Sequence, residues 1–188
     1  MKRFLLPMGA FALIVILLGF GIYNAPRNGS KEIPSPLLGK LVPEFTLPQL
    51  ADAAHPYESK SLRGGWHLVN VWGTWCRECR VEHEALLAIK NEGRVPIVGI
   101  NWKDEDALAT SWLAQLGNPY ETVISDHDGR VAIDWGVYGA PESFLVNPQG
   151  IVVEKTIGAM DMGVWQKKFL PHLSADNGGS SATGKAGA

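Results

Sequence analysis

The two cysteines of this chain lie in one tetrapeptide, Cys76-Arg77-Glu78-Cys79, and the sequence contains no other cysteine. An apolar run over residues 67–72 precedes the tetrapeptide and is typical of a buried strand, whereas residues 80–91 follow it with helical periodicity. Two residues between the cysteines allow one sulfur to attack a disulfide and the other to resolve the mixed disulfide. Such a pair at a junction between a strand and a helix indicates a thiol–disulfide redox couple.

The two sulfurs should have different tasks. We expect Cys76 to be the attacking thiol, because unpaired N–H groups and the dipole at the start of a helix stabilise a thiolate. Cys79 lies one turn further along, so we expect it to be more buried and to resolve the mixed disulfide. The pattern therefore predicts a redox-active Cys76–Cys79 disulfide and no other cofactor.

A metal site is the alternative interpretation of these cysteines, because His83 lies four residues after Cys79. A structural zinc site usually has four ligands, so the incomplete set of Cys76, Cys79 and His83 would suit Cu(I) best. A Cu(I) metallochaperone is thus kept as an alternative, and the leading interpretation assigns no metal. Covalent haem attachment requires a histidine directly after the second cysteine, and Arg80 occupies that position.

Length and charge restrict the function further. The chain has 188 residues, which suits one domain with appendages. Its 17 basic and 19 acidic residues give a formal net charge of −2, without the basic excess typical of proteins that bind nucleic acid. We therefore expect no nucleic-acid partner.

The N-terminus predicts where the chain resides. Lys2 and Arg3 precede residues 4–22, which contain no charged side chain and are numerous enough to span a membrane. The basic start places the N-terminus in the cytoplasm and the rest of the chain on the other side. We expect an uncleaved anchor, and a cleaved signal peptide is the alternative. Both would export the remaining domain.

The expected organisation has four parts. They are a cytoplasmic start with a transmembrane anchor (1–22), a linker (23–35), a folded periplasmic domain (36–173) and a disordered tail rich in Gly, Ser and Ala (174–188).

Within the domain, apolar runs and turn signals predict alternating strands and helices. Strands are expected at 66–72, 95–101, 121–125, 142–147 and 151–158, and helices at 76–91, 104–116, 131–135 and 162–173. Asp104 is expected to open the second helix, and Val81, Ala85, Leu86 and Ile89 to face inward from the first. This order resembles a thioredoxin-like α/β domain, with a central mixed sheet flanked by helices, in addition to the N-terminal transmembrane helix.

Acidic residues and a second motif could also contribute to the chemistry. The run from Gly136 to Glu142 places a proline, Pro141, directly before a predicted strand, where a shaped loop could pair with an extended peptide. Glu82 lies six residues after Cys76 and could point toward the sheet. A partly buried acid there would oppose thiolate formation and favour a reducing couple.

These motifs resemble the CcmG/DsbE family, the membrane-anchored, thioredoxin-like reductases of cytochrome c maturation. The resemblance rests on Trp75-Cys76-x-x-Cys79 and on Gly136-Val137-Tyr138-Gly139-Ala140-Pro141-Glu142, which is the more specific motif. It extends from the anchor to about Leu173 and includes Pro43-Glu44-Phe45-Thr46-Leu47-Pro48.

The resemblance implies roles for individual residues. Cys76 would be the nucleophile, Cys79 the resolving thiol, Pro141 a cis-proline facing them, and Glu82 and Glu142 the acids near the site. The residues expected to face substrate are Trp75, Arg77, Glu78, Tyr138 and Ala140. Asn70 stands where ordinary thioredoxins have a buried aspartate, which makes Glu82 the better candidate for proton handling. The family commonly has proline where this chain has Arg77, whose charge and backbone N–H could make the couple less reducing.

The resemblance also implies a function: a periplasmic thiol–disulfide oxidoreductase, single-pass in the bacterial inner membrane. Its electron acceptors would be apocytochrome c or the haem-ligation proteins, and its electron donor a DsbD-type membrane thiol transporter. A broader-specificity exported thiol reductase is the alternative within the same chemistry.

Overall fold

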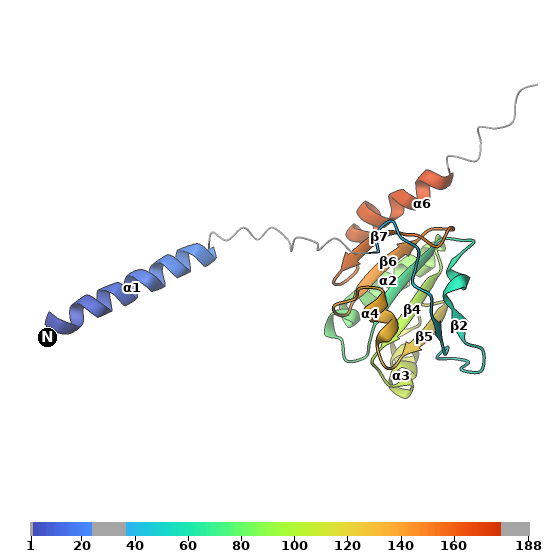
Figure 1. Ribbon diagram of the computed structural model, residues 1–188, viewed down its shortest axis with the longest axis horizontal. Helices are drawn as coiled ribbons and strands as arrows, with labels where there is room; N and C mark the ends of the chain where they lie inside the picture. Colours follow the sequence, from blue (N-terminus) through green and yellow to red (C-terminus); the bar gives the residue numbers. More distant parts are fainter. Residues whose placement is uncertain (1, 24–36, 178–188) are drawn as a thin grey trace, which may run out of the picture. The chain divides into compact units, whose positions relative to one another are not determined.

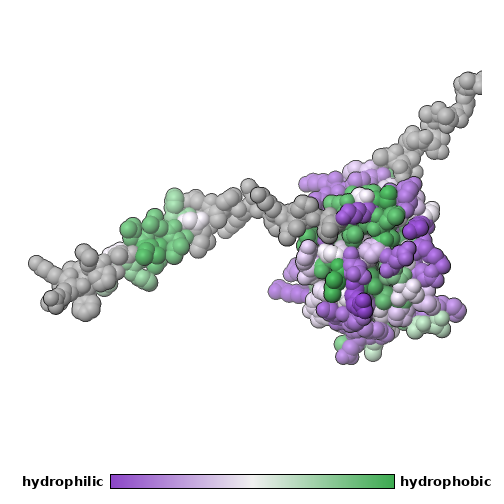
Figure 2. All heavy atoms as spheres, in the orientation of Figure 1, coloured by the Kyte–Doolittle hydropathy of each residue, from purple (hydrophilic) through white to green (hydrophobic). Residues whose placement is uncertain are grey.

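The computed structural model describes residues 2–23 and 37–177, and the chain divides into two units, Met1–Ile33 and Pro34–Ala188 (Figure 1). The first unit contains helix α1, Lys2–Tyr23, whose described large apolar side chains between Met8 and Phe20 are exposed and form the green stretch in Figure 2. Among the helices of the described residues, none meets both the length and the apolar character needed to cross a membrane. The segment predicted as an anchor is thus a helix, but it is not confirmed as a membrane span. The predicted linker, residues 23–35, lies outside the described residues except for Tyr23.

A five-stranded mixed sheet forms the centre of the second unit. Its strands are β3 (His67–Trp72), β4 (Ile97–Trp102), β5 (Thr122–Asp126), β6 (Glu142–Val146) and β7 (Val152–Ile157). The spatial order is β5-β4-β3-β6-β7, in which β3, β4 and β5 run parallel and β6 is antiparallel to both of its neighbours. A separate ribbon pairs β1 (Thr46–Leu47) with β2 (Tyr57–Glu58). The predicted central mixed sheet is confirmed.

Helices cover both faces of the sheet (Figure 1). They are η1 (Ser59–Leu62), α2 (Arg77–Glu92), α3 (Asp106–Leu116), α4 (Arg130–Asp134) and a C-terminal series of α5 (Met162–Val164), η2 (Trp165–Phe169) and α6 (Leu170–Asn177). Because side chains alternate along a strand, Leu68 and Trp72 of β3 join the core beneath α2, α3 and the C-terminal helices. Val69 and Val71 join a second core that includes α4 and η1.

Helix α2 buries the expected face except at one position. Leu86 and Ile89 are buried and Ala85 is half-buried, as predicted, but Val81 is 63 % exposed. Glu82, which was expected to point toward the sheet, is buried, and so is His83. Together with Cys79 they continue the i, i+3, i+4, i+7 stripe that an inward helix face requires. Two polar side chains complete this stripe because both find hydrogen-bond partners inside the domain.

Two predicted boundaries also change. Asp104 does not open α3, which begins at Asp106 with Glu105 as its N-cap residue. The carboxylate of Asp104 is engaged by the turn before α2, as described below. The C-terminal helix continues to Asn177, so the disorder predicted from Ser174 is wrong for its first four residues. The rest of the predicted tail lies outside the described residues.

Candidate active site

Cys76 ends the turn after β3 and is the N-cap residue of α2. Its backbone N–H donates to the carbonyl of Gly73 at 3.1 Å, and its Sγ accepts a hydrogen bond from the backbone N–H of Cys79, also at 3.1 Å. The two sulfurs form the predicted disulfide, and the Cα atoms lie 5.3 Å apart. A backbone donor aimed at Cys76 Sγ from the first helical turn is the arrangement that stabilises a thiolate.

The turn that carries Cys76 is fastened to the end of β4. Both the N–H and the hydroxyl of Thr74 donate to the carboxylate of Asp104, at 2.6 and 2.7 Å. The indole N–H of Trp75 donates to the carbonyl of Trp102 at 3.1 Å, and the two rings meet edge to face. Burial alone would raise the pKa of Asp104, but hydrogen bonds from Thr74 and two neighbouring residues outweigh it and lower the pKa.

The peptide bond between Ala140 and Pro141 is cis, as the resemblance predicted. Pro141 is buried, and its carbonyl accepts a hydrogen bond from the N–H of Gly158 at 2.9 Å. Ala140 packs against the core cluster that contains both cysteines. The proline loop and the disulfide therefore border the same core.

Glu82 is a buried acid held by uncharged donors. It is 1 % exposed, and its two carboxylate oxygens accept hydrogen bonds from the amide of Asn70 at 2.9 Å and from the N–H of Met160 at 2.8 Å. Burial raises the pKa of Glu82 to about 7, although both hydrogen bonds oppose the rise. On α2, Glu82 lies three residues after Cys79, a spacing that makes two side chains neighbours on one helix face. A group with a pKa near neutral pH thus lies one helical turn from Cys79.

Asn70 connects this acid to the centre of the sheet. Its carbonyl oxygen accepts from the hydroxyl of Tyr120 at 2.8 Å, and its amide also donates to Ser143 at 3.0 Å. Tyr120 reaches Asn70 because the neighbouring residue on β4 is Gly99, where a Cβ atom would lie 2.9 Å from the Tyr120 ring. Burial, followed by the charge of Glu82, raises the pKa of Tyr120 well above 10, so its hydroxyl keeps its proton as a donor.

Glu142 is buried as deeply as Glu82 but has a charged partner. It is 0 % exposed at the start of β6, and Lys155 Nζ from β7 lies 2.6 Å from its Oε2. Its Oε1 accepts a hydrogen bond from the N–H of Tyr138 at 2.9 Å. The second predicted acid is therefore one half of a buried ion pair beneath the proline loop.

With this geometry in place, comparison with known proteins decides the family. The Redoxin family model matches residues 37–168. The thiol:disulfide interchange protein DsbE of Pseudomonas aeruginosa is 46 % identical over 173 residues, which cover 91 % of this chain and 93 % of that protein. The DsbE of Escherichia coli is 39 % identical over 172 residues, covering 90 % and 92 %. The chain belongs to the DsbE family of thiol:disulfide interchange proteins.

Solved structures agree on the fold of this DsbE family member. A secreted thiol-disulfide isomerase from Corynebacterium glutamicum superimposes with a TM-score of 0.63 at 21 % identity, covering 72 % of this chain and 86 % of that one. The protein is a thiol–disulfide oxidoreductase with a thioredoxin-like α/β fold. The redox-active pair expected from the sequence is the disulfide at the start of α2.

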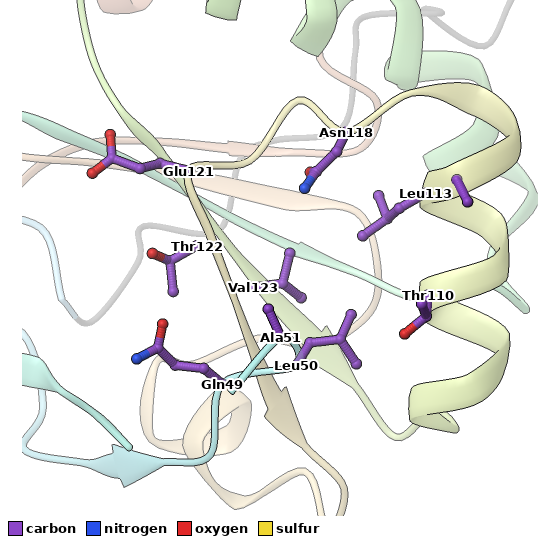
Figure 3. Close-up of a pocket in the computed structure, with 10 residues that line it drawn as sticks. Gln49, Leu50, Ala51, Thr110, Leu113, Asn118, Glu121, Thr122 and Val123 are labelled. Carbon is purple, nitrogen blue, oxygen red and sulfur yellow. The ribbon is translucent and has the colours of Figure 1, made fainter. Parts of the chain in front are cut away.

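The residues predicted to face substrate are mostly at the surface. Trp75 is 54 % and Tyr138 69 % exposed, Arg77 and Glu78 are exposed between the cysteines, and Ala140 is half-buried. Their contact with substrate stays a prediction. An open pocket of about 360 Å³ between the Gln49–Ala51 segment, α3 and β5 contains none of the predicted site residues (Figure 3).

The alternative Cu(I) site has no support in the described part of the chain, where no group of three or more His, Cys, Asp or Glu residues could hold a metal ion. The Nε2 atom of His83 is instead 2.9 Å from the carbonyl of Gly117, and its ring meets Trp112 edge to face. Burial lowers the pKa of His83, which favours a neutral ring.

Sequence reasoning missed Lys155. A glutamate at the start of an apolar strand favours a nearby cation, since a buried carboxyl is either paired with a cation or takes up a proton. That signal does not identify the cation, because the choice depends on how β6 and β7 are aligned. In the structure, Glu142 pairs with Ile157 and Phe144 with Lys155, and the long lysine side chain reaches back to the carboxylate.

Proposed function

We propose that this oxidoreductase reduces disulfides of apocytochrome c, or of the haem-ligation proteins, during biogenesis of c-type cytochromes. Membership of the DsbE family and the run from Gly136 to Glu142 support this role. The observation that carries the direction of electron flow is the burial of Glu82 one turn from Cys79. When this carboxylate is ionised, its negative charge opposes formation of a cysteine thiolate nearby. That destabilises the reduced pair relative to the disulfide and makes the dithiol an electron donor.

The proposed reaction is a pair of exchanges. The Cys76 thiolate attacks one sulfur of the substrate disulfide, forming a mixed disulfide and releasing a substrate thiolate that takes up a proton. The Cys79 thiolate then attacks Cys76 Sγ, which re-forms the intramolecular disulfide and releases the second substrate thiol. Two electrons pass to the substrate in each cycle, so a donor must reduce the Cys76–Cys79 disulfide before the next one.

In this cycle, Glu82 receives the proton of the Cys79 thiol as Cys79 becomes the attacking thiolate. A pKa of about 7 suits that task, because an acid near the working pH accepts and returns a proton with little cost in either direction. Asn70 and the N–H of Met160 hold the carboxylate in place while it does so.

The proposed location is the periplasmic side of the bacterial inner membrane. Lys2 and Arg3, followed by the uncharged residues 4–22, support export and attachment of the domain. The proposed electron donor is a DsbD-type membrane thiol transporter. Membrane fractionation tests the location, with spheroplasts first treated with a reductant that opens the disulfide and then with a membrane-impermeant thiol reagent: we expect a labelled protein in the membrane pellet. A protein that is unlabelled, or that remains in the cytosol, would contradict it.

The first test of the proposed function is the reduction potential of the Cys76–Cys79 couple, measured by equilibration with defined thiol buffers. A reductant should lie toward thioredoxin, about −270 mV, whereas a value toward DsbA, about −120 mV, would reverse the proposed direction.

The second test is complementation of an Escherichia coli strain that lacks its own DsbE. We expect the full chain to restore c-type cytochromes, detected by covalently bound haem, and the Cys76→Ser variant to fail at equal protein level. A chain that reduces other exported disulfides but restores no cytochrome would instead establish the broader-specificity reductase.

A further inference from the structure

Lys155 lies inside the domain against the loop that carries the cis-proline. It is 5 % exposed, its Nζ atom is 2.6 Å from Glu142 Oε2, and it donates to the carbonyl of Gly136 at 3.1 Å. The ammonium also lies over the rings of Phe144 and Tyr138, with Nζ 4.9 and 5.7 Å from their centroids. None of these contacts takes part in the exchange between the two cysteines.

The ion pair holds the loop at two backbone positions. The ammonium of Lys155 donates to the carbonyl of Gly136, and Glu142 Oε1, the oxygen that faces away from Lys155, accepts a hydrogen bond from the N–H of Tyr138 at 2.9 Å. The carbonyl of Gly136 and the N–H of Tyr138 are thus held by the side chains of one ion pair, Lys155 and Glu142. On the far side, Pro141 is held by the N–H of Gly158 at the end of β7.

Stability alone does not account for this arrangement. A buried ion pair adds little net stability compared with well-packed apolar residues of similar volume, since both charges lose their hydration. The pair does impose geometry, because an ammonium flanked by a carboxylate, a carbonyl and two rings has few other places to lie. The Tyr138 ring above it is 69 % exposed and is therefore available to an arriving chain.

We propose that Lys155 is a positioning residue that holds the loop from Gly136 to Glu142 in the shape that receives an extended peptide carrying a disulfide. An extended peptide can bind to exposed backbone groups of a loop through hydrogen bonds, whose strength depends on the direction of each N–H and C=O. The inference goes beyond the proposed function, because it applies to any peptide disulfide and does not require a cytochrome.

The test compares two oxidants of the reduced full chain, purified in mild detergent. One is an oxidised peptide with the sequence Cys-Ala-Ala-Cys between short polar flanks, and the other is hydroxyethyl disulfide, which is too small to span the loop. For Lys155→Met we expect the half-saturating peptide concentration to rise at least about tenfold, with the maximal rate and the hydroxyethyl disulfide rate kept within about twofold. The reduction potential of the couple should be unchanged.

Three variants separate positioning from simple destabilisation. Lys60→Met makes the same replacement in an exposed ion pair with Glu58 and should leave both oxidants unaffected. Leu62→Ala removes a buried side chain from the core that also contains Phe144, leaves both charges of the ion pair in place, and should lower stability without a selective loss of peptide. Lys155→Met combined with Glu142→Gln leaves no buried charge unpaired. If the single variant does not fold, the same two oxidants are compared on this double variant.

A selective loss of peptide exchange in the Lys155 variants supports the proposal. Equal losses for both oxidants, no loss for either, or the same selective loss in Leu62→Ala would each overturn it. Because the peptide is not a cytochrome, these outcomes are independent of whether complementation succeeds.

Discussion

Two glutamates, one on α2 and one on β6, lie almost completely buried, and they have opposite surroundings. Glu82 on α2 is bound by an amide and a backbone N–H, neither of which is charged. Glu142 on β6 is bound by the ammonium of Lys155. Burial raises the pKa of Glu82 to about 7, which suits a group that exchanges protons. An ion pair under a loop suits a group that fixes geometry. Two equally buried glutamates are therefore suited to different roles, and the charge of the hydrogen-bond partner determines which role each of them suits.

The largest expected effect comes from breaking the ion pair. Lys155→Met leaves the carboxylate of Glu142 buried without a cation, so we expect the free energy of unfolding at pH 7 to fall by about 4 kcal/mol. Adding Glu142→Leu should recover most of that loss, because an apolar pair costs no desolvation. Urea unfolding measures both. A single variant as stable as the wild type would show that the two charges are not coupled.

The next effect is the pH dependence of stability that Glu82 produces. Its pKa is raised from 4.5 to about 7 in the folded protein, so its contribution is fully present below pH 4.5 and is lost as pH rises toward 7. The loss amounts to about 3 kcal/mol, since one pKa unit is worth about 1.4 kcal/mol. Relative to wild type, Glu82→Gln should therefore gain about 3 kcal/mol between pH 4.5 and pH 8. Parallel stability curves for the two proteins would contradict the raised pKa.

A smaller effect is expected on the exchange rate. Without a proton acceptor near Cys79, Glu82→Gln should reduce a peptide disulfide about 100-fold more slowly at pH 8, the lower end of general acid–base contributions. Its pH–rate profile should also lose the inflection near 7, whereas Glu142→Gln should retain it. Stopped-flow oxidation of the reduced protein across pH measures both profiles. Loss of the inflection in both variants would remove the distinction between the two acids.

The smallest effect is expected from an exposed charge, which contrasts with both buried acids. Arg77→Pro removes a positive charge and a backbone donor beside Cys76, so the thiolate should lose stability and the reduction potential should fall. Charges at a helix terminus contribute about 0.3–1 kcal/mol in water, which corresponds to about 6–20 mV for a two-electron couple. Equilibration with thiol buffers resolves this shift. An unchanged or raised potential would show that Arg77 does not tune the couple.

The order of strands and helices and the two motifs of the site could be predicted from sequence, because each depends on residues close together in the chain. The Cys76–Cys79 spacing and the proline before β6 are of this kind. The position of Val81 and the partners of Glu82 could not be predicted in the same way. Apolar periodicity assigned Val81 to the core, but it is exposed. Glu82 is buried as expected, and its hydrogen-bond partners, Asn70 and Met160, are distant in sequence.

Lys155 and Asp104 show the same limit. The role of Lys155 depends on the alignment of β6 with β7, which no local pattern specifies. Asp104 has the residue type and position of a helix N-cap, yet its carboxylate accepts hydrogen bonds from Thr74, which follows the neighbouring strand β3. Where a polar side chain has a local and a distant use, the sequence indicates only the local one.

The attachment of Thr74 to Asp104 has a consequence for engineering this protein. The backbone leading into Cys76 is fixed by groups outside the motif, while Arg77 and Glu78 between the cysteines are exposed. A library that varies only positions 77 and 78 would therefore change the electronics of the sulfurs while the scaffold that presents them stays constant. Variation at Thr74 or Asp104 would instead alter how the whole motif is presented, so the two kinds of library should be screened separately.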